Sequence, residues 1–224
     1  MTKLYSYVVE HDHGRNPNPY GGICTLVHCK CAGEKGKQRN IVEMAKKGDW
    51  ILGSGGKSSE STGKNDCIIY LMRVTEKLDI KQYLEDPRFE GRKDRYYDKD
   101  IKNIYALVSD HYFYFGKNAV DISVLPDNLR DKKLFKKCLG YRADLPENSI
   151  NELIKFFEDN CEAIGMYGYP CCPLDDIKVE LKQNTLTHQF SSNNSQSSNI
   201  VENTLPIPKK ETHSTNKDTK GGCR

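Results

Sequence analysis

The stretch Gly48-Asp49-Trp50-Ile51-Leu52-Gly53-Ser54-Gly55-Gly56-Lys57 decides how the rest of the sequence is interpreted. A Gly-Asp turn opens it, three apolar residues follow, and glycines then surround one serine before a lysine. This pattern predicts a short buried strand that leaves into a loop whose backbone can approach a ligand closely. The apolar spacing upstream predicts a helix over residues 40–47 that Gly48 ends. Downstream, residues 67–74 form a second and longer predicted strand.

Other segments extend this alternation of strands and helices. Asp79 is the predicted N-cap of a short helix that stops before Pro87, and Asn148-Ser149 caps a predicted helix over residues 150–161. Short runs of β-branched, aromatic and other apolar residues predict further strands at 4–9, 23–29, 103–109, 111–116 and 177–181.

Composition points to one folded unit followed by a polar tail. The 224 residues are 37% hydrophobic and 29% charged, with a net charge of +3 that does not indicate a strongly basic nucleic-acid binder. From about residue 183 Ser, Asn, Thr, Gln and Lys dominate, so we predict a domain over 1–182 and a disordered tail over 183–224. No run approaches the about 20 apolar residues of a membrane span, which predicts a cytoplasmic protein without a membrane partner.

Nine cysteines raise the question of disulfides or a metal. Their odd number and irregular spacing argue against a disulfide framework. Cys24, Cys29 and Cys31 are the candidate zinc ligands, with His28, His11 and His13 nearby in the sequence, but no pair has C-x-x-C spacing. We therefore predict neither a bound metal nor a cofactor.

Two loops carry the residues best suited to recognise a ligand. The loop after the first strand holds His11, Asp12 and His13, and it continues to Gly22 through a segment rich in Gly, Pro and Asn. A base or nucleotide needs an aromatic ring to stack on and polar groups at its edge. Residues 11 and 12 can supply such groups, and the predicted binding set beyond them is Tyr20, Gly22, Trp50, Ser54, Gly55, Gly56, Lys57 and Tyr112. Core packing is the alternative role for each aromatic residue, Trp50 above all.

No strong catalytic signature accompanies these residues. The glycine stretch lacks the spacing of a phosphate-binding loop, and Ser54 as a nucleophile would need a positioned base. The segment 91–102 mixes basic and aromatic residues, as nucleic-acid surfaces do, although a solvated face is the simpler interpretation.

The order of elements resembles the PUA-like folds, with the EVE and ASCH domains as the nearest branches. More narrowly, residues 7–14, 18–22 and 48–56 resemble the second of the nucleotide modification associated domain families, over about residues 3–180. This resemblance implies an α+β fold with a small mixed β-barrel, and a role near modified bases or nucleotides in phage or mobile-element systems.

The resemblance leaves the activity open. PUA-like domains read bases or nucleic acid without chemistry, which favours binding of a modified base, nucleotide or nucleic acid. The modification-associated families have been proposed to include enzymes. Here His11 or His13 would be the general base with Asp12 orienting it, or Cys24 would be a nucleophile or metal ligand. A protein-interaction module that uses Arg92 to Lys102 is the third possibility.

Overall fold

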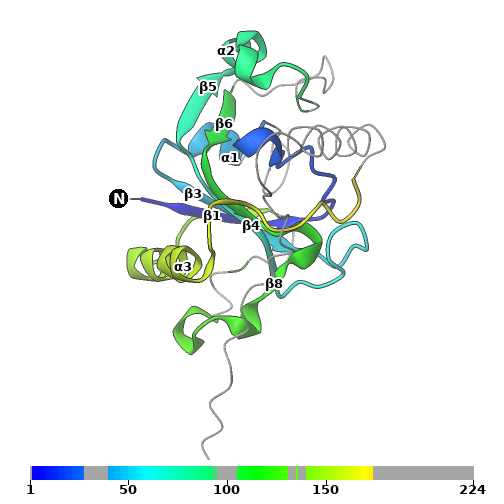
Figure 1. Ribbon diagram of the computed structural model, residues 1–224. Helices are drawn as coiled ribbons and strands as arrows, with labels where there is room; N and C mark the ends of the chain where they lie inside the picture. The colour runs from blue at the N-terminus through cyan, green and yellow to red at the C-terminus, as the bar shows by residue number, and fades with distance from the viewer. Residues whose placement is uncertain are drawn as a thin grey trace, which may run out of the picture.

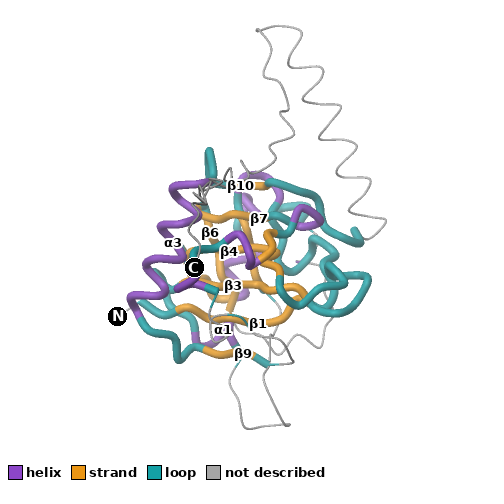
Figure 2. Tube along the Cα trace, turned by 90° about the horizontal axis from the view of Figure 1, so that it is seen from below, coloured by secondary structure: helices purple, strands orange, loops and turns teal. Residues whose placement is uncertain are grey.

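The computed structural model describes residues 2–27, 40–92, 94, 105–130, 135 and 140–173. In this part of the chain a large sheet has the strand order β10-β7-β4-β3-β1-β9 with β8 beside β4, and a small sheet has the order β2-β6-β5 (Figures 1 and 2). The strands are β1 Leu4–Val9, β2 Cys24–Leu26, β3 Trp50–Gly55, β4 Cys67–Arg73, β5 Glu76–Asp79, β6 Tyr105–Ser109, β7 His111–Tyr114, β8 Val120–Asp121, β9 Tyr141–Arg142 and β10 Gly165–Met166. The helices are α1 Ile41–Met44, α2 Ile80–Glu85 and α3 Glu147–Asn160, with short 3-10 turns at Tyr20–Gly22, Pro87–Phe89, Gly116–Asn118, Ile122–Val124 and Asp127–Leu129.

The centre of the large sheet is formed by β1, β3 and β4. β1 and β3 run parallel, with Leu4 opposite Trp50 and Val9 opposite Gly55, whereas β3 and β4 are antiparallel. A parallel pair needs a crossover connection, and the chain between Val9 and Trp50, which includes β2 and α1, makes it. Both strands therefore end at the same edge of the sheet.

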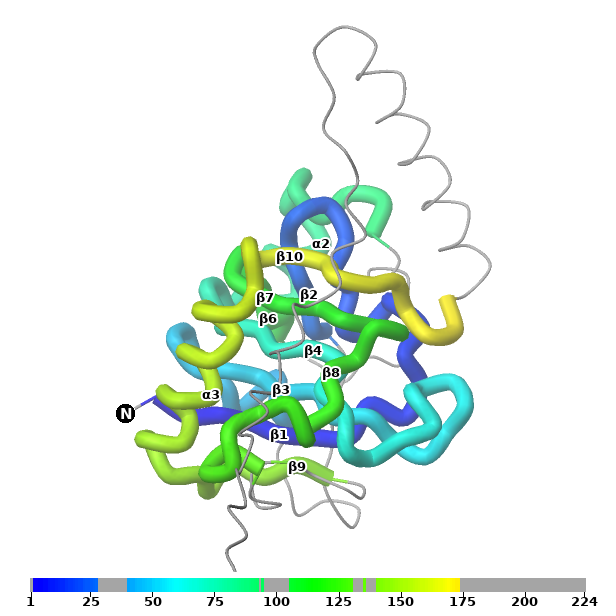
Figure 3. Tube along the Cα trace, turned by 60° about the horizontal axis from the view of Figure 1, so that its bottom comes forward, coloured from blue at the N-terminus to red at the C-terminus, as the bar shows by residue number. Residues whose placement is uncertain are grey.

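Alternation along the strands divides the core between the two faces of the large sheet. Trp50 and Leu52 pack on one face, in the cluster that contains Leu153 and Phe157 of α3, and Figure 3 shows α3 at this sheet. Ile51 points the other way, into the cluster that contains residues of α1, β2 and β6. This period of two is what a strand buried on both faces requires.

The small sheet continues the large one. β4 pairs with β7 in the large sheet, and the segments next to them, β5 and β6, pair with each other in the small sheet. The Thr75 amide donates to the Val108 carbonyl at 2.9 Å where the chain passes between the sheets. Asp110, between β6 and β7, therefore joins strands that belong to different sheets.

Two predicted helix ends need correction. The helix predicted over residues 40–47 is one turn long, because Ala45 has extended backbone dihedrals; Asn40 caps its start by accepting a hydrogen bond from the Glu43 amide. The long helix begins at Glu147 with Pro146 at the N-cap position, so the predicted Asn148-Ser149 cap is wrong. Asp79 does cap α2, through a capping box with Gln82.

Gly53 and Gly55 are residues of strand β3 and not of a loop. A Cβ atom on Gly53 would lie 2.2 Å from the Tyr70 ring and 2.8 Å from the Val9 side chain. A Cβ on Gly55 would lie 2.3 Å from the Thr62 hydroxyl oxygen. These two glycines are required because neighbouring protein atoms approach the backbone. The prediction that the chain leaves the strand before Gly55 was therefore wrong.

The α+β class is confirmed, with mostly sheet and few helices. Neither sheet closes on itself within the described ranges, so the expected small barrel is not seen there and the PUA-like plan stays a prediction. None of the helices described has the length and apolar composition needed to cross a bilayer. The strand predicted at 177–181 and the tail at 183–224 lie outside the described residues.

Candidate functional site

Two loops meet at the edge where β1 and β3 end. The loop after β1 is joined to the loop after β3 by a hydrogen bond from the Asp12 amide to the Glu60 carbonyl, 2.9 Å long. A Cβ atom on Gly56 would lie 3.3 Å from the Val9 carbonyl oxygen, which shows how closely the two backbones run. This contact unites residues that are 48 positions apart in the sequence, and Figure 3 shows the blue and cyan loops beside each other.

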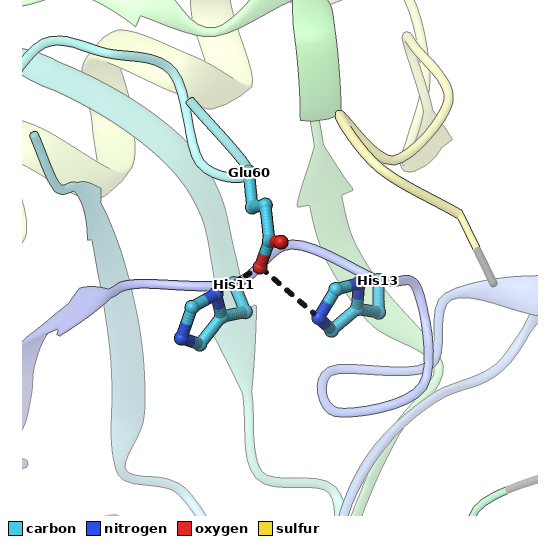
Figure 4. A group of neighbouring side chains, drawn as sticks. All are labelled: His11, His13 and Glu60. Carbon is cyan, nitrogen blue, oxygen red and sulfur yellow. Dashed lines mark ion pairs between the residues drawn. The ribbon is translucent and has the colours of Figure 1, made fainter. Parts of the chain in front are cut away.

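Two histidines and a glutamate converge on this edge (Figure 4). His11 Nδ1 contacts Glu60 Oε2 directly, and His13 Nε2 lies 3.7 Å from the same oxygen. The two imidazole rings are parallel within 6°, with centroids 5.6 Å apart. The side chains are 54%, 29% and 46% exposed for His11, His13 and Glu60, so a ligand in solution can reach all three.

Asp12 points in the opposite direction, into the core. It is fully buried, accepts hydrogen bonds from the Tyr114 hydroxyl and, at 3.1 Å, from the Cys171 amide. Burial raises the pKa of the Asp12 carboxyl, and these two hydrogen bonds oppose the shift. The predicted role of Asp12 in orienting a histidine is therefore not supported; Glu60 is the carboxylate that contacts the imidazoles.

The backbone of the segment after Pro170 holds His13 in place. His13 Nδ1 lies 2.7 Å from the Cys172 carbonyl oxygen, and the Cys172 amide donates to the Asp12 carbonyl at 3.1 Å. In the neutral imidazole the Nδ1 atom must carry the proton in order to donate to a carbonyl oxygen. The Nε2 atom, which faces Glu60, then has a free lone pair.

Two aromatic residues of the predicted binding set are core residues. Trp50 is 4% exposed and packs edge-on against the His111 ring. Tyr112 is 2% exposed, and its hydroxyl donates to the Pro19 carbonyl at 2.7 Å. Their burial supports core packing, which was the alternative role.

The serine and the glycines on either side of it are buried. Ser54 is fully buried and its hydroxyl donates to the Tyr7 carbonyl at 3.0 Å, an arrangement that suits a structural residue better than a nucleophile. The Gly56 amide donates to the Ser61 hydroxyl, and Gly55 packs on Thr62. Of the predicted residues on this segment Lys57 is exposed.

The far end of the first loop is held from within the protein. Tyr20 is half-buried, and its hydroxyl packs against Gly14: a Cβ atom on Gly14 would lie 2.7 Å from the Tyr20 hydroxyl oxygen. Gly22 is exposed. The Arg92 guanidinium donates to the carbonyls of Tyr20 and Asn18 at 2.9 and 2.7 Å. Arg92 is 10% exposed, so it is a structural residue and not part of the solvated face predicted for residues 91–102.

The sulfur candidates do not form a metal site among the described residues. Cys24 is fully buried and donates to the Met72 thioether at 3.8 Å, and burial raises the pKa of its thiol well above the usual value. Cys29 and Cys31 lie outside the described residues.

A groove at the opposite ends of the strands is a weaker candidate site. It has a volume of about 570 Å³ and is lined by Lys47, Gly48, Arg73, Val74, Thr75, Glu76 and Asp110. Its two basic and two acidic side chains offset each other, and Glu76 is bound by Arg88. The groove therefore lacks the net positive charge that a phosphate site needs.

Sequence reasoning identified His11 and His13 but missed Glu60 and Cys172. Alternation beyond β1 was the available signal for the inward Asp12, because neighbours in an extended segment point to opposite sides. Glu60 lies in the loop after β3, and only the parallel pairing of β1 with β3 brings that loop to the histidines. The Cys172 contact is a backbone interaction, which side-chain patterns do not reveal.

Comparison with known protein families gives a match. A protein-family model described as nucleotide modification associated domain 2 matches residues 1–97 and 90–175, which together span the strands and loops described above. No curated protein and no solved structure was found to match the chain.

Proposed function

Because the chain belongs to the nucleotide modification associated domain 2 family, we propose that it binds a nucleotide or a modified base at the edge where β1 and β3 end. The observation that supports this most is the convergence of His11, His13 and Glu60, held together by the hydrogen bond between the Asp12 amide and the Glu60 carbonyl. In open α/β sheets ligands bind beyond the carboxyl ends of the parallel strands, and β1 and β3 are a parallel pair that ends at this edge.

The chemistry of these side chains suits such a ligand. Imidazole rings stack on bases, and protonated imidazole binds phosphate oxygens. The exposed ring of His11 is accessible from solution, and Lys57, which is exposed on the segment after β3, is a cation for a phosphate. The buried Trp50 and Tyr112 have no part in this proposal.

The test is a thermal-shift panel of free nucleosides and nucleotides, modified and unmodified, with the full chain. A ligand that binds the folded state raises the melting temperature by mass action. We expect a shift with one class of compound, and we expect His11→Ala and Glu60→Gln to reduce it. Glu158→Gln is the matched control, because Glu158 has the same 46% exposure and also contacts a histidine, His111, at 3.4 Å. A shift that is equal in all four proteins would exclude this edge as the binding site.

A second candidate function is a nucleotide-modifying enzyme with a His-Glu pair as general base. The contact of His11 Nδ1 with Glu60 favours it, because a carboxylate at one ring nitrogen orients the imidazole and leaves the other nitrogen for a substrate proton. The two functions differ in mutants. Under binding alone, His11→Ala weakens the thermal shift and mass spectrometry detects no converted compound. Under catalysis, binding largely survives in His11→Ala and product formation is lost.

A further inference from the structure

The geometry points to a divalent metal site formed by His11, His13 and Glu60, in which each residue offers one ligand atom and these atoms all lie within 4.8 Å of one another. Figure 4 shows the Glu60 carboxylate reaching between the two imidazole rings from the neighbouring loop. This inference does not depend on nucleotide binding, because a metal can bind here without a nucleotide.

The backbone contact of His13 is the first argument. Histidines that ligate metals usually donate their second ring N–H to a carbonyl or carboxylate, which fixes the tautomer and the ring orientation. The 2.7 Å contact of His13 Nδ1 with the Cys172 carbonyl has this arrangement. It leaves the Nε2 lone pair directed at a carboxylate oxygen 3.7 Å away. In the neutral ring this lone pair and the carboxylate oxygen face each other, and a metal cation between them would bind both atoms.

The way Asp12 is anchored is the second argument. His11 and His13 flank Asp12 in the sequence, and the inward carboxylate of Asp12 is bound by Tyr114 and by the Cys171 amide. Successive side chains along an extended segment point to opposite sides. Because the Asp12 side chain points into the core, those of His11 and His13 both point outward. The parallel rings, 5.6 Å apart, follow from this arrangement. The two nitrogen ligands are therefore held on backbone that is anchored at its centre.

The donor set defines the class of metal. Two imidazole nitrogens and one carboxylate oxygen suit Zn²⁺, Fe²⁺, Co²⁺ and similar ions better than Mg²⁺ or Ca²⁺, which prefer oxygen ligands. Donors each about 2.1 Å from one ion lie roughly 3.0–3.5 Å apart, so small rotations of three partly exposed side chains close the site. Three protein ligands leave coordination positions open, which is typical of catalytic and not of structural sites.

Co²⁺ is the probe that tests this inference, because its visible absorption reports its ligands. We expect metal-free full-length protein to bind Co²⁺ saturably, with visible d–d bands and without the strong near-ultraviolet band of thiolate ligands. His11→Ala, His13→Ala and Glu60→Gln should each weaken this binding by at least about tenfold, the loss typical even of an outer-shell partner. Glu158→Gln, the matched control defined above, should bind Co²⁺ as the parent does.

Each other outcome would overturn the inference. A thiolate band that persists in all variants would assign the bound Co²⁺ to cysteines elsewhere in the chain. Absence of saturable binding would mean that Glu60 and the histidines form an ion pair only. Circular dichroism and the melting temperature of each variant without Co²⁺ separate loss of the site from loss of the fold. Nucleotide shifts measured without Co²⁺ test the proposed function separately, so the two proposals can fail independently.

Discussion

At the scale of single residues, the exposed site depends on one buried carboxylate. Asp12 accepts hydrogen bonds through both oxygens, from Tyr114 and from the Cys171 amide, and it thereby connects the first loop, β7 and the segment after β10. A buried donor that loses its acceptor is costly, about 1–3 kcal/mol. The buried side chain of Asp12 thus holds the backbone that carries His11 and His13.

We expect Asp12→Asn to lower the free energy of unfolding by about 1–3 kcal/mol, because the amide NH₂ faces a donor where the carboxylate had accepted. Tyr114→Phe removes the same contact from the other side, so the double variant should lose less than the sum of the single changes. Tyr112→Phe is the control: its hydroxyl bonds to the Pro19 carbonyl and not to Asp12, so its effect should add to that of Asp12→Asn. Urea unfolding of six proteins gives the comparison: the parent, the three single variants, and the two double variants that combine Asp12→Asn with each tyrosine change. Simple additivity of the Asp12 and Tyr114 changes would contradict the coupling.

At the scale of elements, a charged contact joins β5 to the turn after α2. Glu76 accepts two hydrogen bonds from the Arg88 guanidinium, at 2.7 and 2.9 Å, and Arg88 also binds Asp86. Hydrogen bonding by Arg88 lowers the pKa of the Glu76 carboxyl below its usual value. Both side chains are more than a third exposed, at 38% and 45%, so solvent screening keeps the contribution small.

This contact should make stability depend on pH in a defined direction. A carboxyl whose pKa is lower in the folded state adds stability above its unfolded pKa of about 4.3, and this stability is lost as the pH falls through the folded pKa. We expect Glu76→Gln to be less stable than the parent at pH 7 by under about 1 kcal/mol. The difference should shrink below about pH 4.3. Urea unfolding at pH 7 and pH 3 gives the comparison, and a difference that stays constant between them would show that the charge is not responsible.

Element prediction succeeded where local chemistry decides the structure. β1, β4 and the Asp79-capped helix α2 follow from apolar runs and a capping box, both of which act within a few residues. The prediction for the stretch after Leu52 was wrong because a distant contact decides its structure. Gly53 must be a glycine because the Tyr70 ring on the neighbouring strand lies against it. That contact depends on the pairing of β3 with β4, which cannot be deduced from the local sequence.

At the scale of the whole molecule, the site is made by long-range connections that no local pattern encodes. His11 and His13 were predicted because a loop after a strand with several polar side chains is a common binding segment. Their partner Glu60 comes from the loop after β3, and the carbonyl that orients His13 comes from Cys172, 159 positions away. Sequence reasoning could therefore name two of the three residues of the cluster, but it could not show that they come together.

The segment after α3 should be essential to the fold, whereas the polar tail should not be. β10 pairs with β7, the Tyr167 amide donates to the Tyr114 carbonyl at 2.7 Å, and the Lys117 amide donates to the Tyr169 carbonyl at 2.8 Å. The same segment supplies the Cys171 amide to Asp12 and the Cys172 carbonyl to His13. Ending the chain after residue 164 removes all of these contacts together.

We expect a chain that ends at residue 182 to melt at the same temperature as the full chain, because the composition from residue 183 onward predicts no buried core. A chain that ends at residue 164 should melt at a clearly lower temperature, and any Co²⁺ or nucleotide binding should be lost with the support of Asp12 and His13. Calorimetry of the three proteins measures this. If the chain ending at 164 kept both its melting temperature and its Co²⁺ binding, the contacts of Cys171 and Cys172 would be incidental to the site. If the chain ending at 182 were destabilised, the tail would contribute to the fold and the domain boundary proposed from composition would be wrong.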